Sequence, residues 1–136
     1  MAEVIVADKK TAIGAPSSIG HEKYVVTYDF SEDGGASANT YTLIEFENAC
    51  AVKLEALRVR TAGTSGGSAT ISLGIAAGTE FLSASAIAGF SAGAIINQAN
   101  GGEFYKVEDG EKLVLSIGTA DLTAGKFEML FDVIQA

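Results

Sequence analysis

The residues best able to do nucleophilic chemistry are the single cysteine, Cys50, and the single histidine, His21. A thiol beside an imidazole can act as a nucleophile, but no known nucleophile motif surrounds Cys50. Cys50 stands between two alanines at the expected start of a strand, where a free cysteine behaves as a small buried apolar residue. We therefore expect no catalytic role for either residue, and one histidine cannot build a His-rich metal site.

Two groups of carboxylates stand beside glycines, where their oxygens could bind Ca²⁺. The members are Asp29, Glu32 and Asp33 before Gly34-Gly35, and Glu108, Asp109 and Glu111 around Gly110. Neither group has the spacing of an established calcium loop, and acidic residues with glycine are ordinary turn chemistry. The glycine-rich stretches also lack a phosphate-binding motif. We predict two solvated turns and a chain with no cofactor, no metal and no enzymatic activity.

The charge balance limits the class of partner. Seventeen acidic and nine basic side chains give a formal net charge of −8, which argues against nucleic acid because phosphate contacts need clustered cations. The acidity serves solubility or matches a basic partner surface. No run approaches the roughly 18 apolar residues of a membrane helix, and the N-terminus does not have the form of a secretory signal. We expect no membrane contact and synthesis in the cytoplasm.

Short alternating runs, separated by glycine and polar turn residues, predict β-strands along most of the chain. The clearest alternation covers Lys23 to Phe30, Ala69 to Ala76 and Lys112 to Gly118. Roughly eight to ten strands at this spacing indicate a sandwich or jelly roll. We predict an all-β fold, a single antiparallel β-sandwich of jelly-roll-like order with helices confined to single turns. The inward phase assigns four residues to its core: Leu73, Leu115, Phe127 and Phe131.

The long strand from Ala51 to Thr61 changes its alternating phase near Ala56-Leu57. A shift by one residue predicts a β-bulge, which would return Leu57 and Val59 to the core face. After this strand, we expect a glycine-rich hairpin loop over Thr61–Ser68.

Three other segments have weaker signals. Thr79–Ser83 is expected to be a short strand, and Ala84–Gly93 an irregular connection because its glycines oppose a helix. Ala120–Gly125 is expected to be a loop.

The two ends of the chain supply the candidate contact residues. We divide the chain into an N-terminal arm, residues 1–20, and a β-sandwich domain, residues 21–136. Within the arm, Glu3–Asp8 is expected to be a short strand and Lys9–Gly20 an extended loop. Apolar residues at a terminus, or on the outer side of the last strand, can add to a neighbouring subunit. The candidate contact residues are Val4, Ile5, Val6, Leu130 and Ile134; alternatively, the last two face the second sheet of a central strand.

From about Leu54 to the end, the order of features resembles that of small β-sandwich virion proteins of tailed bacteriophages. The features, in order, are the strand Leu54–Arg60, the hairpin Gly63-Thr64-Ser65-Gly66-Gly67, the runs Ala69–Ile75, Phe81–Ala86 and Leu113–Thr119, and a loop ending in Ala124-Gly125 before a final strand. The resemblance implies a capsid decoration or cement protein on the outer surface of the virion head. It also implies two partners, the major capsid protein and the chain itself, as a homotrimer.

A second function remains open, because fold style alone does not decide function. A carbohydrate- or receptor-binding β-sandwich module, such as a fibre tip or a lectin-like domain, would have the same strand pattern. Such a module would show a shallow groove lined by aromatic side chains and carboxylates, whereas a cement protein would be inert to glycans and bind expanded heads.

Overall fold

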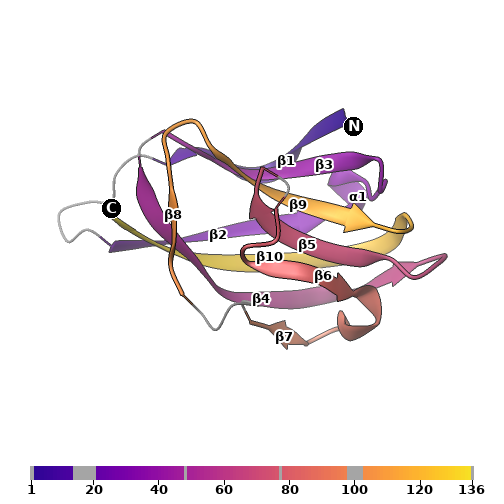
Figure 1. The fold of residues 1–136 in the computed structure, drawn as a ribbon. Helices are drawn as coiled ribbons and strands as arrows, with labels where there is room; N and C mark the ends of the chain where they lie inside the picture. Colours follow the sequence, from indigo (N-terminus) through magenta and orange to yellow (C-terminus); the bar gives the residue numbers. More distant parts are fainter. Residues whose placement is uncertain (1, 14–20, 48, 77, 98–102, 136) are drawn as a thin grey trace.

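Two β-sheets packed face to face make up the molecule (Figure 1). The structure, a computed structural model, describes residues 2–13, 21–47, 49–76, 78–97 and 103–135. The elements are β1 (Ala2–Ile13), β2 (His21–Asp29), α1 (Phe30–Asp33), β3 (Asn39–Phe46), β4 (Cys50–Ser65), β5 (Thr70–Ile75), β6 (Leu82–Ala86), a 3₁₀ turn (Ile87–Gly89), β7 (Ile95–Ile96), β8 (Tyr105–Val107), β9 (Lys112–Gly118) and β10 (Leu122–Gln135). The predicted all-β sandwich with single-turn helices is confirmed; the jelly-roll order stays a prediction.

The two sheets divide the chain in an interleaved order. Sheet A has the order β1-β3-β9-β5-β6, and sheet B has the order β2-β10-β4-β7, with β8 also paired to β4. The described pairs are antiparallel except β1 with β3, which is parallel. β10 is central in sheet B, between β2 and β4, and its sequence is apolar on both sides although only one side faces the other sheet.

The predicted β-bulge is present in β4. Leu130 pairs with Ala56 and Phe131 pairs with Leu54, so Glu55 is the extra residue on β4. The bulge lies one residue before the predicted place and restores the phase, because Leu54 and Leu57 are both buried. One inserted residue thus lets a 16-residue strand keep its apolar side on the core.

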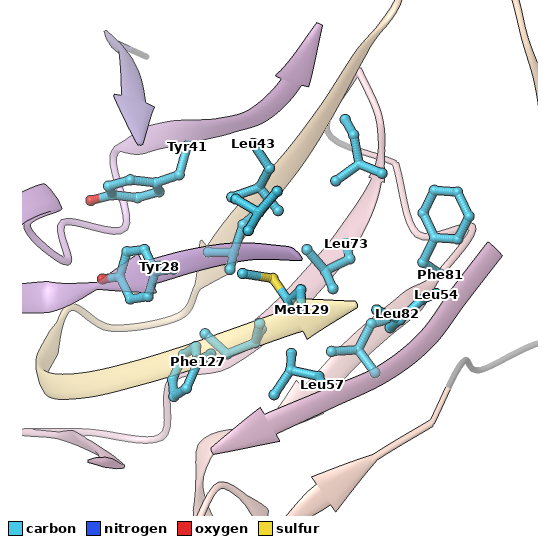
Figure 2. Close-up of a cluster of buried hydrophobic side chains, with 14 of the residues drawn as sticks. Tyr28, Tyr41, Leu43, Leu54, Leu57, Leu73, Phe81, Leu82, Phe127 and Met129 are labelled. Atoms are coloured by element: carbon cyan, nitrogen blue, oxygen red, sulfur yellow. The ribbon is translucent and has the colours of Figure 1, made fainter. Parts of the chain in front are cut away.

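The core fills the space between the sheets (Figure 2). All four predicted core residues are confirmed: Leu73, Leu115, Phe127 and Phe131 are 0% exposed. The Phe127 ring stacks on Tyr28 at 5.5 Å between centroids and tilts against Phe90 at 5.1 Å. Each large side chain removed from water in this way contributes about 1.5–3 kcal/mol.

Two segments expected to be loops are strand in the structure. β4 continues to Ser65 and β10 already begins at Leu122, so the expected loops over 61–68 and 120–125 are wrong over most of their lengths. The reason is close approach at two glycines. A Cβ on Gly63 would lie 2.5 Å from Ile87 Cδ1, and one on Gly125, whose φ is +150°, would lie 3.0 Å from Phe127 Cζ. Both glycines therefore lie inside strands, where the β4–β10 register is irregular and side chains pack closely against the backbone.

The segment after β5 also differs from expectation. The short strand is Leu82–Ala86, a shift of three residues from the expected Thr79–Ser83, because Ala86 and Ser85 pair with Thr70 and Ile71 of β5. The start of the expected irregular segment, 84–86, therefore belongs to β6.

The N-terminal strand is longer than expected. β1 extends from Ala2 to Ile13, past the expected Glu3–Asp8, and pairs in parallel with β3 at the edge of sheet A. The rest of the expected loop, residues 14–20, lies outside the described residues.

Candidate functional site

The structure separates the two residues that could have formed a nucleophilic pair. Cys50 begins β4 and His21 begins β2, and β10 lies between these strands. Cys50 is 0% exposed, and this burial raises the pKa of its thiol to about 11. The thiol is therefore protonated at neutral pH and behaves as a small apolar core residue.

In both groups of acidic residues, a carboxylate accepts a hydrogen bond from a backbone N–H of the same turn. Asp29 caps α1: its Oδ1 accepts hydrogen bonds from Ser31 N at 2.9 Å and Ser31 Oγ at 2.7 Å, which lower the pKa of Asp29. In the second group, Glu108 N donates to Glu111 Oε1 at 2.7 Å, and Gly110 has a φ of +87°. The carboxylates thus serve the turn geometry.

Within the described part of the chain, no three side chains of His, Cys, Asp or Glu gather in a way that could hold a metal ion. No helix among the described residues has the length and apolar character needed to cross a membrane.

The three candidate contact residues of the N-terminus do not share one environment. Val6 is buried (1% exposed) and Val4 packs partly buried against the core. Ile5, between them on the other side of β1, is 52% exposed. Of the three, Ile5 is the side chain that sheet A presents to solvent.

Leu130 and Ile134 lie on the opposite sheet, on the side of β10 that faces away from the core. Their neighbours in β10 at 129, 131 and 133 are all buried, whereas both are half-buried. Leu130 stands in register with Val25 of β2 and Ala56 of β4. The side chains of Leu130, Val25 and Ala56 line a shallow hollow of about 250 Å³, together with those of Arg58, Ile95 and Glu128.

This outer side of sheet B carries most of the cations of an acidic chain. The outward positions hold six of the nine lysines and arginines, which surround the apolar centre Val25, Ala56, Ile95 and Leu130: Lys23, Lys53, Arg58, Arg60, Lys106 and Lys126. Five carboxylates lie among or beside them at described positions: Asp29, Glu55, Glu128, Asp132 and Glu108, whose Oε1 lies 3.9 Å from Lys106 Nζ. We call this surface the basic face.

Ion pairs order part of the basic face. Lys23 Nζ donates hydrogen bonds to Asp132 Oδ1 and to Glu55 Oε2, each at 2.6 Å. Both hydrogen bonds raise the pKa of Lys23, and the one to Asp132 has the larger effect. Arg60 Nη1 lies 3.3 Å from Glu128 Oε1. The Asp132 side chain is only 9% exposed, whereas the partners in the other two pairs are solvent-accessible, where ion pairs add little to stability.

A second surface, on sheet A, has the opposite character. Its hollow of about 460 Å³ is lined by Glu3, Thr40, Thr42, Ala76, Gly110, Glu111, Lys112 and Val114. The exposed Glu108 and Asp109 belong to the turn at its rim, which two backbone hydrogen bonds hold against the end of β3: Phe46 N to Glu111 O at 3.0 Å and Gly110 N to Phe46 O at 2.8 Å. We call this surface the acidic hollow.

Three exposed apolar residues of the basic face were not among the sequence candidates, among them Phe104, which is 42% exposed and whose ring centroid lies 5.5 Å from Lys53 Nζ. Val25 is 48% exposed and Ile95 is 66% exposed. The alternation in Lys23–Phe30 already placed Val25 on the side opposite Tyr24, Val26 and Tyr28, so the signal for Val25 was available. Ile95 carried no such signal, because β7 has only two residues and its neighbour Ile96 is equally apolar.

Comparison with known proteins gives a likeness of fold alone. No protein-family model matches the chain, and no curated protein matches it. A chain in the acidic stable capsid structure of Helicobacter pylori bacteriophage KHP30 aligns with 84% of this chain and 92% of its own length, at 18% identity and a TM-score of 0.53. A chain in the cyanophage Pam1 capsid asymmetric unit aligns with 91% of this chain and 93% of its own length, at 21% identity and a TM-score of 0.54. The chain therefore shares the fold of chains found in two phage capsids.

Proposed function

We propose that this chain is a non-enzymatic structural protein of a phage virion, a decoration or cement protein that binds the outer surface of the head and stabilises it. The observation that carries the proposal is the likeness of fold, over more than four-fifths of the chain, to chains in two phage capsid structures. The chemistry agrees with it, because the one cysteine is buried and its thiol is protonated at neutral pH.

Its partners in this proposal are the major capsid protein and two further copies of the chain. Five residues are assigned to these contacts: Val4, Ile5, Val6, Leu130 and Ile134. Ile5 and Leu130 give the assignment its physical basis, since an apolar side chain that stays in solvent gains about 1.5–3 kcal/mol on full burial. The arm, residues 1–20, would act mainly through the edge strand β1.

Binding to heads that lack the chain tests the function. Purified chain is mixed with expanded phage heads that lack it, and the mixture is sedimented. The controls are the chain without heads and an unrelated acidic β-sandwich protein with heads. We expect the chain to sediment with the heads and to raise the temperature at which they release DNA. A chain that stays in the supernatant contradicts the proposal, and retention on a glycan array instead would favour a carbohydrate-binding module.

A further inference from the structure

Exposed apolar side chains concentrate on one side of this molecule. Among the described residues, four large apolar side chains are exposed, and three of them lie on the basic face: Val25, Ile95 and Phe104. The fourth, Ile5, lies on the outer side of sheet A. A cluster of exposed apolar side chains marks a contact surface on a protein.

Val25 and Ile95 belong to the shallow hollow of the basic face, which has a volume of about 250 Å³. Two adjacent rows of residues, each in register across sheet B, line this hollow. The first row is Val25, Leu130 and Ala56, and the second row is Glu128, Arg58 and Ile95. Because a cavity of about 150 Å³ is large enough for a benzene molecule, the hollow has room for one side chain of the size of leucine.

The lining of the hollow contains two charged side chains, Arg58 and Glu128. Glu128 Oε1 already pairs with Arg60 Nη1 at 3.3 Å. Arg58 is exposed, and within the parts of the chain that the structure describes it forms no ion pair. The guanidinium of Arg58 is therefore the cation of this hollow that remains available to a ligand.

The apolar walls and the guanidinium together select the chemistry of that ligand. An apolar wall takes an apolar side chain, and a guanidinium binds a carboxylate through two parallel hydrogen bonds. Since Arg58 lines the same hollow as Leu130 and Ile95, the two groups of the ligand must lie close together.

In the C-terminal residue of a peptide, the side chain and the carboxylate branch from one Cα. In an internal residue of an extended segment, the same position is a neutral amide and the adjacent side chains point to the opposite side. Capture of a C-terminal carboxylate is also an established mode of peptide recognition. We propose that the shallow hollow binds the C-terminal residue of a partner chain, with an apolar side chain against Val25, Leu130 and Ile95 and the carboxylate on Arg58.

Short peptides test this site without phage heads, so the test does not depend on the proposed function. The probe is acetyl-Gly-Gly-Leu with a free carboxylate, and its control is the same peptide with a C-terminal amide. In an NMR titration of the ¹⁵N-labelled chain, the acid should shift the backbone signals of residues 25, 56–58, 95 and 130, with a dissociation constant of about 1 mM. The amide should bind at least about fivefold more weakly, because it cannot form the charge-assisted hydrogen bonds.

A third peptide, acetyl-Leu-Gly-Glu-amide, separates the two sources of a carboxylate. It carries its carboxylate on a side chain two residues from leucine, and it should bind no better than the amide control. Equal binding of this peptide and the acid would assign the hollow to an internal acidic segment and contradict the proposed C-terminus.

Matched variants test the role of the guanidinium. Arg58→Gln should bind the acid and the amide with equal affinity. Lys53→Gln removes the same charge from the same strand at a position that does not line the hollow, and it should keep the preference for the acid. Ile95→Ser should weaken both peptides by a similar factor, because it removes an apolar wall. Thermal unfolding of each variant checks that the fold is intact.

Three results would overturn the proposal: no shift at the residues of the hollow up to about 10 mM acid, equal affinity for the acid and the amide, or a folded Arg58→Gln variant that keeps the preference for the acid. A chain that binds the acid peptide but not phage heads would contradict the proposed function alone. A chain that binds heads but not the peptide would refute the peptide site alone.

Discussion

The outer sides of the two sheets differ in how far their side chains are covered from solvent. On sheet A, Thr42 is 0% exposed and its Oγ1 donates to Glu3 Oε2 at 2.5 Å, while Lys112 Nζ donates to the same carboxylate oxygen at 3.1 Å. Further along the same side, Glu80 Oε1 accepts a hydrogen bond from Ile75 N at 2.9 Å. Sheet A thus covers much of its outer side with its own polar side chains.

Sheet B leaves its apolar outer side chains in solvent. Val25 and Ile95 are about half or more exposed at the centre of the basic face, and the ion pairs of Lys23 and Arg60 lie around them without covering them. The difference indicates that the outer side of sheet A around Thr42 contributes to the stability of the folded monomer, whereas the exposed apolar side chains of sheet B contribute little to it. Substitutions on the two sides should therefore differ in what they change.

The largest effect should come from the inner side of β10, which sets the scale. Phe131→Ala removes a ring that is 0% exposed and contacts Phe81 at 6.2 Å between centroids. We expect a loss of about 3–5 kcal/mol in the free energy of unfolding, measured by urea denaturation of dilute protein. Its matched control is the adjacent outward residue: Leu130→Ala should cost about 1 kcal/mol. Equal losses at both positions would contradict the assigned orientation of the strand.

The next effect lies on sheet A, where the outer side is closely packed. In Gly74→Ala the new Cβ would lie 2.2 Å from Gly78 C and 2.3 Å from Glu80 Oε1, so the β5–β6 connection must shift. We expect a loss of about 1–3 kcal/mol, measured by thermal and urea unfolding. Gly66→Ala is the control, because nothing lies within 4 Å of its Cβ and it should be neutral. A neutral Gly74→Ala would show that this side is open.

The sequence predicts this fold where inward and outward residues alternate with a period of two along a segment. The inward phase of Leu73, Leu115 and Phe131 and the bulge in β4 follow from alternation alone, because a period of two assigns each residue to a side. The prediction of loops at Gly63 and Gly125 was wrong for a physical reason. Glycine lets neighbouring side chains approach the backbone closely inside a strand as well as in a loop.

The candidate surface was only partly predictable. Alternation placed Leu130 and Ile134 opposite the core residues of β10, but no local pattern shows which strands flank β10. The contact of Leu130 with Val25 and Ala56, and the gathering of Lys23, Lys53 and Arg58 around them, depend on pairings between residues 70 to 109 positions apart. Charge segregation of this kind is a property of the sheet order.

A smaller effect distinguishes the two outer sides by a pair of opposite substitutions. Thr42→Val on sheet A removes the hydroxyl that donates to Glu3, at a position with 0% exposure, and should cost about 1 kcal/mol. Val25→Thr on sheet B makes the reverse change at a position that is 48% exposed and should change the stability of the monomer by less than about 0.5 kcal/mol. The measurement is urea denaturation of both variants. A larger loss for Val25→Thr than for Thr42→Val would reverse the comparison.

The smallest effect is a pH dependence at the α1 end of the basic face. Hydrogen bonds from the Ser31 side chain and backbone lower the pKa of Asp29 in the folded chain below its value in the unfolded chain. The stabilisation is therefore complete above the unfolded pKa of about 3.9 and is lost as the pH falls through the lower, folded pKa. Because Asp29 is partly exposed to solvent, screening limits the effect to less than about 1 kcal/mol.

Asp29→Asn isolates this contribution, because an amide oxygen still accepts the Ser31 hydrogen bonds but does not titrate. Urea denaturation at pH 5 and pH 2.5 should show a smaller fall in the free energy of unfolding for the variant than for the unaltered chain. Glu55→Gln is the control, since its carboxylate pairs with Lys23 at the far end of β2 and is not bonded to Ser31. If Asp29→Asn left the fall unchanged, the cap of α1 would contribute no charge-dependent stability, and the acid sensitivity of the chain would have to come from the carboxylates elsewhere.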